Sequence, residues 1–338
     1  MRDKLVDALK GYACFLVVFG HVIMGIRKCG INIPYGAQNV EEFIWTFHVA
    51  LFMFLSGYVY HVTGEWKSKG TRVSFIKHKF INLAIPYFVF SIVYICVNKF
   101  LGGSSVNNEM TMKDILWLWK EPIAQYWFLY DLFFIFVAFT FFSKWLKNWQ
   151  ITLLLAGIQA ISTTLGISVP MPFAAMIRMV LPFGIGTSIN KLYINESTKA
   201  EKFVCVLAHI TLTEIFLFYS LDKYVLLDML ISALGCFASI ALISSLAKCD
   251  FINKVLLFIC KYSFPIYLLH TIFTAGIRVV LVKCGINNYF LHVIIGSVFG
   301  LFFPIVGAMV CNKIDIFNFF FYPGKILKKW EKIKQERT

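Results

Sequence analysis

The sequence predicts an all-α integral membrane protein, built as a bundle of about ten transmembrane helices. Of its 338 residues, 59% are hydrophobic and 15% are charged, and the mean hydropathy is +0.73. Soluble domains usually contain roughly 45–50% apolar and about 25% charged residues. Long apolar runs also fill most of the chain, and a spanning helix needs about 20 such residues. Little length is left for a soluble domain.

Ten apolar runs, separated by loop residues, predict the spans. They cover residues 11–26, 43–62, 80–101, 126–142, 149–167, 173–190, 203–221, 225–247, 263–282 and 289–311. A shorter apolar stretch at 251–260 precedes the ninth run and is expected to form an interfacial helix. We expect one transmembrane domain over residues 1–312 and a basic cytoplasmic tail over residues 313–338.

The distribution of basic residues predicts the orientation of the bundle. The net charge is +14, but Lys and Arg lie in short loops and in the tail rather than on one amphipathic face, so nucleic acid is not an expected partner. Most of the 32 Lys and Arg residues fall in the loops that share a side with the N-terminus. Cytoplasmic loops carry such an excess. Both termini are therefore expected in the cytoplasm, and an even number of spans agrees with their lying on the same side.

Nine cysteines are present without a CxxC pair or a Cys/His ligand spacing. This pattern argues against a zinc site and against a disulfide framework, and no metal is expected. Cys29 and Cys284 fall in predicted outer loops, where two free thiols are expected rather than a disulfide.

Ionisable residues inside the apolar runs are the candidate functional groups. In "DALKGYACFLVVFGH", Lys10 and His21 are eleven residues apart, which is about three helical turns or roughly 16 Å along one face. His48, in the second run, reaches a similar depth if the two helices are antiparallel neighbours. Arg178 falls in the outer half of the sixth run. Such groups either mark a functional path or pair with neighbours to fix helix packing. The combination of two histidines with a buried arginine favours the functional path over simple packing, because imidazole tolerates burial and accepts a proton near pH 7.

The predicted cytoplasmic loop "KSKGTRVSFIKHKF" carries a cluster of cations, Lys67, Lys69, Arg72, Lys77 and Lys79. Two interpretations are open. The cluster is a topology signal attracted to anionic lipid, or it is a clamp for phosphate groups.

Five segments together resemble the integral membrane acyltransferase-three family. They are "DALKGYACFLVVFGH", "FHVALFMFLSGYVY", "INLAIPYFVFSIVY", "YWFLYDLFFIF" and "FPIYLLHTIF". Members of that family commonly O-acetylate bacterial surface polysaccharides. The resemblance implies an acyltransferase of the bacterial cytoplasmic membrane. Its acyl donor would be cytoplasmic acyl-CoA, by family frequency acetyl-CoA. Its acceptor would be a hydroxyl of a cell-surface glycan or of its lipid-linked precursor.

The resemblance also implies roles for particular residues. In the family, a basic residue and a histidine spaced in the first span as Lys10 and His21 are here form a signature, and the histidine is essential. Lys77 and Lys79 stand where many members carry an Arg-x-Arg pair, although lysine lacks the planar two-pronged contact of arginine. We therefore expect Lys10, Lys77, Lys79 and Arg72 to bind the CoA phosphates.

His21 is expected to act either as the base that deprotonates the acceptor hydroxyl or as the group that accepts the acyl chain itself. His48 would orient His21 or shuttle its proton, and Arg178 would bind the acceptor or the oxyanion. His270, in "FPIYLLHTIF", is expected to be a hydrogen-bonding group between helices rather than a second catalyst.

Two other classes of function remain open at this point. Buried charges in a bundle also line the route of a transporter or flippase for a glycan or a small anionic solute, although the two halves of the chain show no repeat. A structural or regulatory subunit would use the same histidines only for packing. The sequence identifies neither the acceptor nor the oligomeric state.

Overall fold

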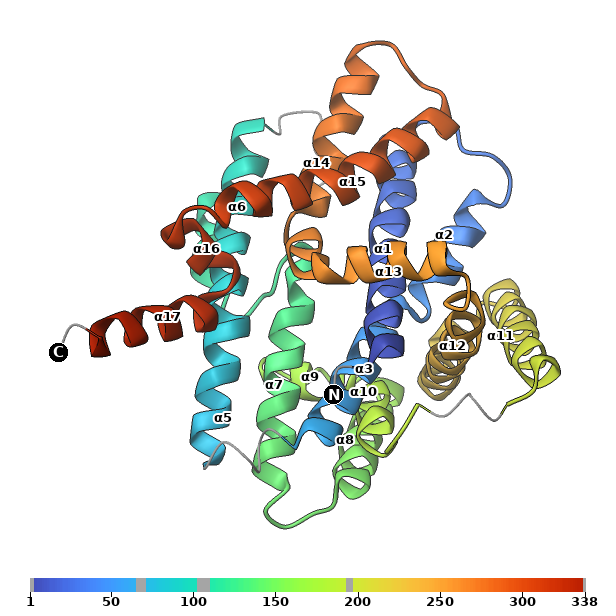
Figure 1. Ribbon diagram of the computed structural model, residues 1–338. Coiled ribbons are helices and arrows are strands. Elements are labelled where there is room, and N and C mark those ends of the chain that lie inside the picture. Colours follow the sequence, from blue (N-terminus) through green and yellow to red (C-terminus); the bar gives the residue numbers. More distant parts are fainter. Residues whose placement is uncertain (1–2, 65–70, 102–109, 193–196, 337–338) are drawn as a thin grey trace.

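The computed structural model describes residues 3–64, 71–101, 110–192 and 197–336 (Figure 1). Over these residues the chain is helical and contains no strand, which confirms the predicted fold class. The α-helices are α1 (Lys4–Lys28), α2 (Ala37–Trp45), α3 (His48–Thr63), α5 (Arg72–Lys79), α6 (Ile85–Leu101), α7 (Trp127–Phe142), α8 (Asn148–Thr164), α9 (Phe173–Ile177), α10 (Val180–Thr187), α11 (Lys199–Phe218), α12 (Val225–Leu246), α13 (Asp250–Lys261), α14 (Ser263–Lys283), α15 (Tyr289–Cys311), α16 (Asp315–Phe321) and α17 (Pro323–Gln335).

Seven helical stretches among the described residues are long and apolar enough to cross a membrane. They are Lys4–Lys28, Ala37–Thr63, Arg72–Lys99, Ala124–Phe142, Val225–Leu246, Ser263–Lys283 and Tyr289–Cys311. Each coincides with one of the ten predicted runs. The chain is thus a multi-pass helical membrane protein, and its described residues contain fewer helices of spanning length than the ten apolar runs predict.

The other three runs differ from simple spans for identifiable reasons. The run at 173–190 is broken, because α9 ends at Ile177 and α10 begins only at Val180, after Met179, whose φ of −123° is not helical. The helix α8 has 17 residues. The helix α11 has 20, but four of them are charged: Lys199, Glu201, Lys202 and Glu214.

The first helix lies at the centre of the bundle (Figure 1). It contacts α2, α3, α12, α13, α14 and α15. It starts earlier than predicted because Asp3 caps it, accepting a hydrogen bond from the Leu5 backbone N–H at 2.9 Å. Asp and Ser-type residues at this position satisfy otherwise free amide groups of the first turn. Lys10 is therefore held inside a regular helix rather than in a loop.

Glycine permits the closest helix contacts. A Cβ placed on Gly57 of α3 would lie 2.0 Å from the Phe183 carbonyl oxygen of α10, and one on Gly186 of α10 would lie 2.1 Å from the Phe54 carbonyl oxygen. Helices without side chains at the contact approach closely and gain dispersion energy in a bilayer, where no hydrophobic effect drives them together. The middle of α3, one to three turns after His48, is held against α10 in this way.

Two breaks interrupt the second and third spans. The helix α3 begins at His48 after the non-helical residue Phe47, and Ser232 of α12 donates a hydrogen bond to the Thr46 carbonyl at 2.6 Å. Between α5 and α6, residues Phe80–Ala84 form a π-helical turn. Short π turns of this kind are frequent at functional sites. His48 thus sits on the first turn of its helix, where a preceding break sets its position.

The basic C-terminal segment is helical and packed. Phe321 of α16 packs against Phe90 of α6 with ring centroids 4.9 Å apart and the rings tilted by 53°, and Ile326 of α17 is buried. Lys329 also pairs with Asp315 at 2.7 Å. The segment is therefore docked on the bundle through Phe321 and Ile326, whereas most side chains of residues 328–336 are exposed.

Candidate active site

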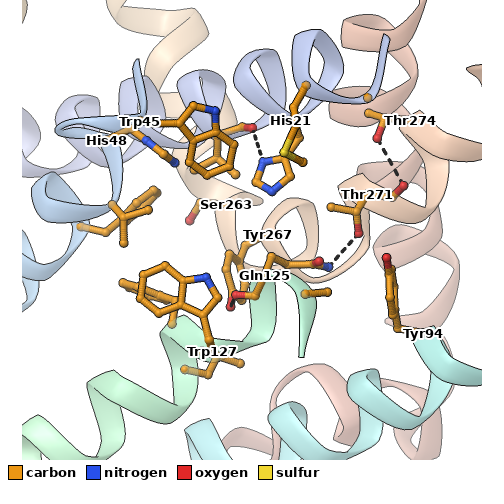
Figure 2. A pocket seen from close by; sticks show the side chains of 18 of the residues that line it. His21, Trp45, His48, Tyr94, Gln125, Trp127, Ser263, Tyr267, Thr271 and Thr274 are labelled. Carbon is orange, nitrogen blue, oxygen red and sulfur yellow. Dashed lines mark hydrogen bonds between the residues drawn. The ribbon is translucent and has the colours of Figure 1, made fainter. Parts of the chain in front are cut away.

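A cavity of about 490 Å³ lies inside the bundle, between α1, α3, α7 and α14 (Figure 2). Its wall is mainly aliphatic and aromatic, and polar side chains interrupt it at a few points, as is common for sites that bind small molecules. The polar and indole-bearing residues on the wall are Lys10, His21, Lys28, Trp45, His48, Ser56, Tyr94, Gln125, Trp127, Ser263, Tyr267, Thr271, Thr274 and Arg278.

The helix α1 gives the length of the cavity. Lys10, His21 and Lys28 all line it. At about 1.5 Å per residue, His21 lies roughly 16 Å from Lys10 and roughly 10 Å from Lys28 along the helix axis. The total of about 27 Å approaches the ~30 Å of a bilayer's hydrocarbon core. The cavity therefore follows α1 across most of the membrane, with an imidazole between two cationic ends.

The ring of His21 is oriented by its own helix. Its Nδ1–H donates a hydrogen bond to the Val17 carbonyl at 2.8 Å (Figure 2). A carbonyl oxygen only accepts, so the proton of the neutral ring is on Nδ1 and the lone pair is on Nε2. His21 consequently presents a basic nitrogen on a wall that is otherwise largely apolar.

Trp45 separates the two histidines that the sequence predicted to meet. The rings of His21 and Trp45 are 5.0 Å apart, and those of Trp45 and His48 are 4.9 Å apart, both edge to face. His48 is fixed as His21 is, by an Nδ1–H bond to the Ile44 carbonyl at 2.8 Å. The indole Nε1–H of Trp45 is buried and has no hydrogen-bond partner within the described chain. An unused buried donor beside a base is a candidate contact for substrate.

His270 also contacts His21. The two ring centroids are 4.8 Å apart, and His270 is 0% exposed. Its Nδ1–H is shared between the carbonyls of Ile266 and Tyr267, each at 2.9 Å, while its Nε2 has no partner among the described residues. A packing role for His270 was predicted from the sequence, but the sequence could not show that His270 packs against His21.

A hydrogen-bonded group from α14 and the short turn Ala124–Tyr126, just before α7, faces His21 across the cavity (Figure 2). Gln125 donates through Nε2 to Thr271 Oγ1 at 2.8 Å, and Tyr267 donates its hydroxyl proton to the Gln125 carbonyl at 2.6 Å. Ala124, just before, has a φ of +44°, in the left-handed region that non-glycine residues seldom adopt. Such strain often accompanies functional positions. The side-chain oxygen Oε1 of Gln125 has no partner within the described chain.

The wall of the cavity is cationic at both ends. Lys10 lies at one end, and Lys28 and Arg278 lie toward the other. The described residues that line the cavity include no Asp or Glu. The nearby acid Glu41 is engaged by Arg27 through two bonds of 2.8 and 2.9 Å. Anionic ligands are therefore favoured at either end of the cavity.

Arg178 lies one layer away from this wall. Its Nε is 3.5 Å from a carboxylate oxygen of the buried Asp131, and its guanidinium is 5.5 Å from the ring centroid of Trp127, which does line the cavity. The Arg178 side chain is 38% exposed. Its contact with the cavity thus runs through the indole of Trp127.

The predicted phosphate clamp lies on α5, apart from the cavity wall. Arg72 and Lys77 are exposed, and the ammonium group of Lys79 lies 4.4 Å from the centroid of the Phe136 ring. Lys67 and Lys69 fall outside the residues that the structure describes. All nine cysteines, including Cys29 and Cys284, are free thiols.

Comparison with protein families gives one match over most of the chain. A family model described as an acyltransferase domain matches residues 3–309. This range includes every residue that lines the cavity. Comparisons with curated proteins and with solved structures gave no match.

Proposed function

The chain belongs to the integral membrane acyltransferase family, and from this premise we propose that it moves an acyl group from acyl-CoA to a hydroxyl of a glycan. The donor is acetyl-CoA, entering from the cytoplasm. The acceptor is a cell-surface glycan or its lipid-linked precursor at the opposite face of a bacterial cytoplasmic membrane. Both termini lie in the cytoplasm in this proposal, so Lys10 marks the inner end of the cavity and Lys28 the outer end.

The observation that carries the proposal is the position of His21. Its free Nε2 lies on the wall of a cavity that follows α1 between cationic ends. Acyl transfer between a cytoplasmic thioester and an acceptor from the other side requires such a meeting point. A histidine that only packed helices together would have no reason to face a cavity with its basic nitrogen unpaired.

In the proposed reaction His21 is a general base. Nε2 takes the proton of the acceptor hydroxyl as its oxygen attacks the thioester carbonyl, giving a tetrahedral oxyanion. Collapse of the oxyanion breaks the carbon–sulfur bond, and the proton on Nε2 passes to the leaving CoA sulfur. General bases contribute about 10²–10⁴-fold to such reactions. The alternative, in which Nε2 attacks the carbonyl and carries the acyl group, uses the same nitrogen.

Two neighbours of His21 have distinct proposed roles. Trp45 supplies its unpaired Nε1–H to the oxyanion, because a buried, pre-oriented donor stabilises charge that develops in the transition state. His48 contacts the other side of the indole and holds it in place. Arg178 supports Trp127, on which an acceptor sugar ring can stack.

The donor is held at the inner end in this proposal. Lys10 lines the cavity and has no ion-pair partner among the described residues, so its ammonium is available to a phosphate of acyl-CoA. The exposed side chains of Arg72 and Lys77, with Lys79, are proposed as further contacts to the nucleotide end of CoA. Their places on α5, outside the cavity, suit a part of the donor remote from the reacting carbon.

Acyl transfer by the purified chain tests this function. The full chain in lipid nanodiscs is incubated with acetyl-labelled acetyl-CoA and a panel of envelope glycans, and label in the glycan is measured. We expect transfer by the wild type and a loss of about 10²–10⁴-fold in His21→Gln. The matched control is His209→Gln. His209 lies on α11, is buried against the rings of Phe43 and Phe47, and does not line the cavity.

The same preparation distinguishes the rival functions. Movement of a glycan across vesicles without consumption of acetyl-CoA would identify a transporter or flippase and would reject the acyltransferase. Undiminished transfer by His21→Gln would still support an acyltransferase, but it would reject His21 as part of the active site.

A further inference from the structure

We propose that the acceptor carries an anionic group, a carboxylate or a phosphate, and that Lys28 and Arg278 bind this group at the end of the cavity away from Lys10. The inference rests on the proposed function, since it assigns the two ends of one cavity to two different substrates. It adds an acceptor subsite and a chemical class of acceptor.

The two cations reach this end of the cavity from different helices. Lys28 lies on the last turn of α1, and Arg278 comes from α14. Gly25 makes the approach possible, because a Cβ at this residue would lie 2.0 Å from Nη1 of Arg278. The guanidinium therefore occupies space that any side chain at position 25 would fill. This fit fixes the planar group against α1, on the same helix face as Lys28 one turn later.

Neither cation is neutralised within the described chain. No salt bridge joins Lys28 or Arg278 to a described carboxylate, and none of the described cavity-lining residues is acidic. Glu41, the buried acid of this region, is occupied by Arg27. Arg278 is only half-buried, but it lies within a span, where an unpaired charge is costly and usually serves a function. Lys28 is exposed at the end of α1, so an anionic ligand would offset this cost for Arg278 and gain a second cationic contact from Lys28.

The position of the pair indicates the acceptor rather than the donor. Lys10 already provides a cation at the inner end, roughly 27 Å away along α1. Lys28 is only about 10 Å along the axis from His21, so an anion held there belongs to a molecule whose hydroxyl reaches Nε2 from the outer side. Arginine adds selectivity, because its fork matches the two oxygens of a carboxylate or a phosphate.

Binding of matched glycolipid probes tests the subsite without requiring turnover. Dodecyl glucoside, dodecyl glucuronide and dodecyl glucose 6-phosphate differ in whether they carry no charge, a carboxylate or a phosphate. Their dissociation constants are measured on the full chain in nanodiscs. We expect at least one anionic probe to bind about tenfold or more tightly than the neutral probe, and the stronger of the two identifies the preferred anion. Equal binding of all three probes would overturn the proposal.

Variants assign the preference to the two residues. Lys28→Gln with Arg278→Gln should remove the preference to within about threefold, while binding of the neutral probe and the KM for acetyl-CoA stay unchanged. The control pair, Lys120→Gln with Lys283→Gln, removes two exposed cations that do not line the cavity and should keep the preference. A preference that survives in the first pair would reject the site. A raised KM for acetyl-CoA in that pair would assign the cations to the donor and also reject it.

Gly25→Ala gives a second test that changes no charge. Its Cβ displaces the guanidinium of Arg278, so the preference for the anionic probe should fall while the neutral probe binds as before. Probe selectivity without any transfer of acetyl groups would leave the subsite standing and reject the proposed reaction. Transfer of acetyl groups without any preference for the anionic probes would support the reaction and reject the subsite.

Discussion

Replacement of Trp45 by phenylalanine separates the role of its N–H group from that of its ring. Phenylalanine keeps an aromatic ring between His21 and His48, whose centroids lie 5.0 and 4.9 Å from that of the indole. It removes the Nε1–H, which is buried without a partner in the described chain. In the proposed reaction this donor stabilises the tetrahedral oxyanion.

The expected loss of activity in Trp45→Phe follows from this role of the N–H group. Loss of one oxyanion donor lowers kcat by about 10²–10³, or about 2.7–4 kcal/mol of transition-state stabilisation. The KM for acetyl-CoA should change little, because the contact strengthens only as charge develops. Stability should not fall by a comparable amount, since a buried donor without a partner already costs about 1–3 kcal/mol in the folded state.

The assay measures initial rates of label transfer from acetyl-CoA, with the melting temperature of each variant in the same detergent. Trp149→Phe is the matched control, because Trp149 is exposed and does not line the cavity. A kcat for Trp45→Phe within about threefold of the wild type would refute the oxyanion role. A parallel loss of kcat and melting temperature would show that the indole acts by packing alone.

Three further predictions concern other parts of the chain. His270→Asn removes a ring 4.8 Å from that of His21, so kcat and its pH profile should both shift while the KM for acetyl-CoA stays constant; an unchanged pH profile would show that His270 only packs. Lys77→Ala with Lys79→Ala should raise the KM for acetyl-CoA more than it lowers kcat, because contacts remote from the reacting carbon bind ground and transition states alike. A fall in kcat at constant KM would count against a phosphate-binding role. Gly57→Ala places a Cβ 2.0 Å from a backbone carbonyl and should cost about 1–3 kcal/mol as overpacking. The melting temperature should fall in Gly57→Ala but not in the control Gly157→Ala, whose Cβ meets nothing within 4 Å.

The spans were largely predictable because apolar length is a local property of the sequence. Seven of the ten predicted runs correspond to helices of spanning length. Hydropathy missed the break between α9 and α10, because most residues around it are apolar; the signal lay in Pro182, which has no N–H to bond to the Arg178 carbonyl and fits only the first turn of a new helix. Hydropathy reports burial in lipid and is insensitive to a local change of backbone direction.

The site was predictable along one helix and not between helices. The spacing of Lys10 and His21 placed both on one face of α1, and both line the cavity. Trp45 gave only a weak signal, its place three residues before His48, and His270 gave none that distinguished it from a packing group. Both contact His21 only through the packing of α2 and α14 on α1. Lys28 and Arg278 lie far apart in the sequence, and nothing in their local sequence indicates that they converge.

The central claim is that acyl-CoA reaches His21 through the cavity along α1. The most direct measurement is an experimental structure of the full chain bound to a non-hydrolysable acetyl-CoA analogue. We expect a CoA phosphate at Lys10 and the acetyl carbonyl beside Nε2 of His21, with room for one hydroxyl between them. An analogue bound elsewhere on the bundle, or one whose acetyl group lies away from His21, would contradict it.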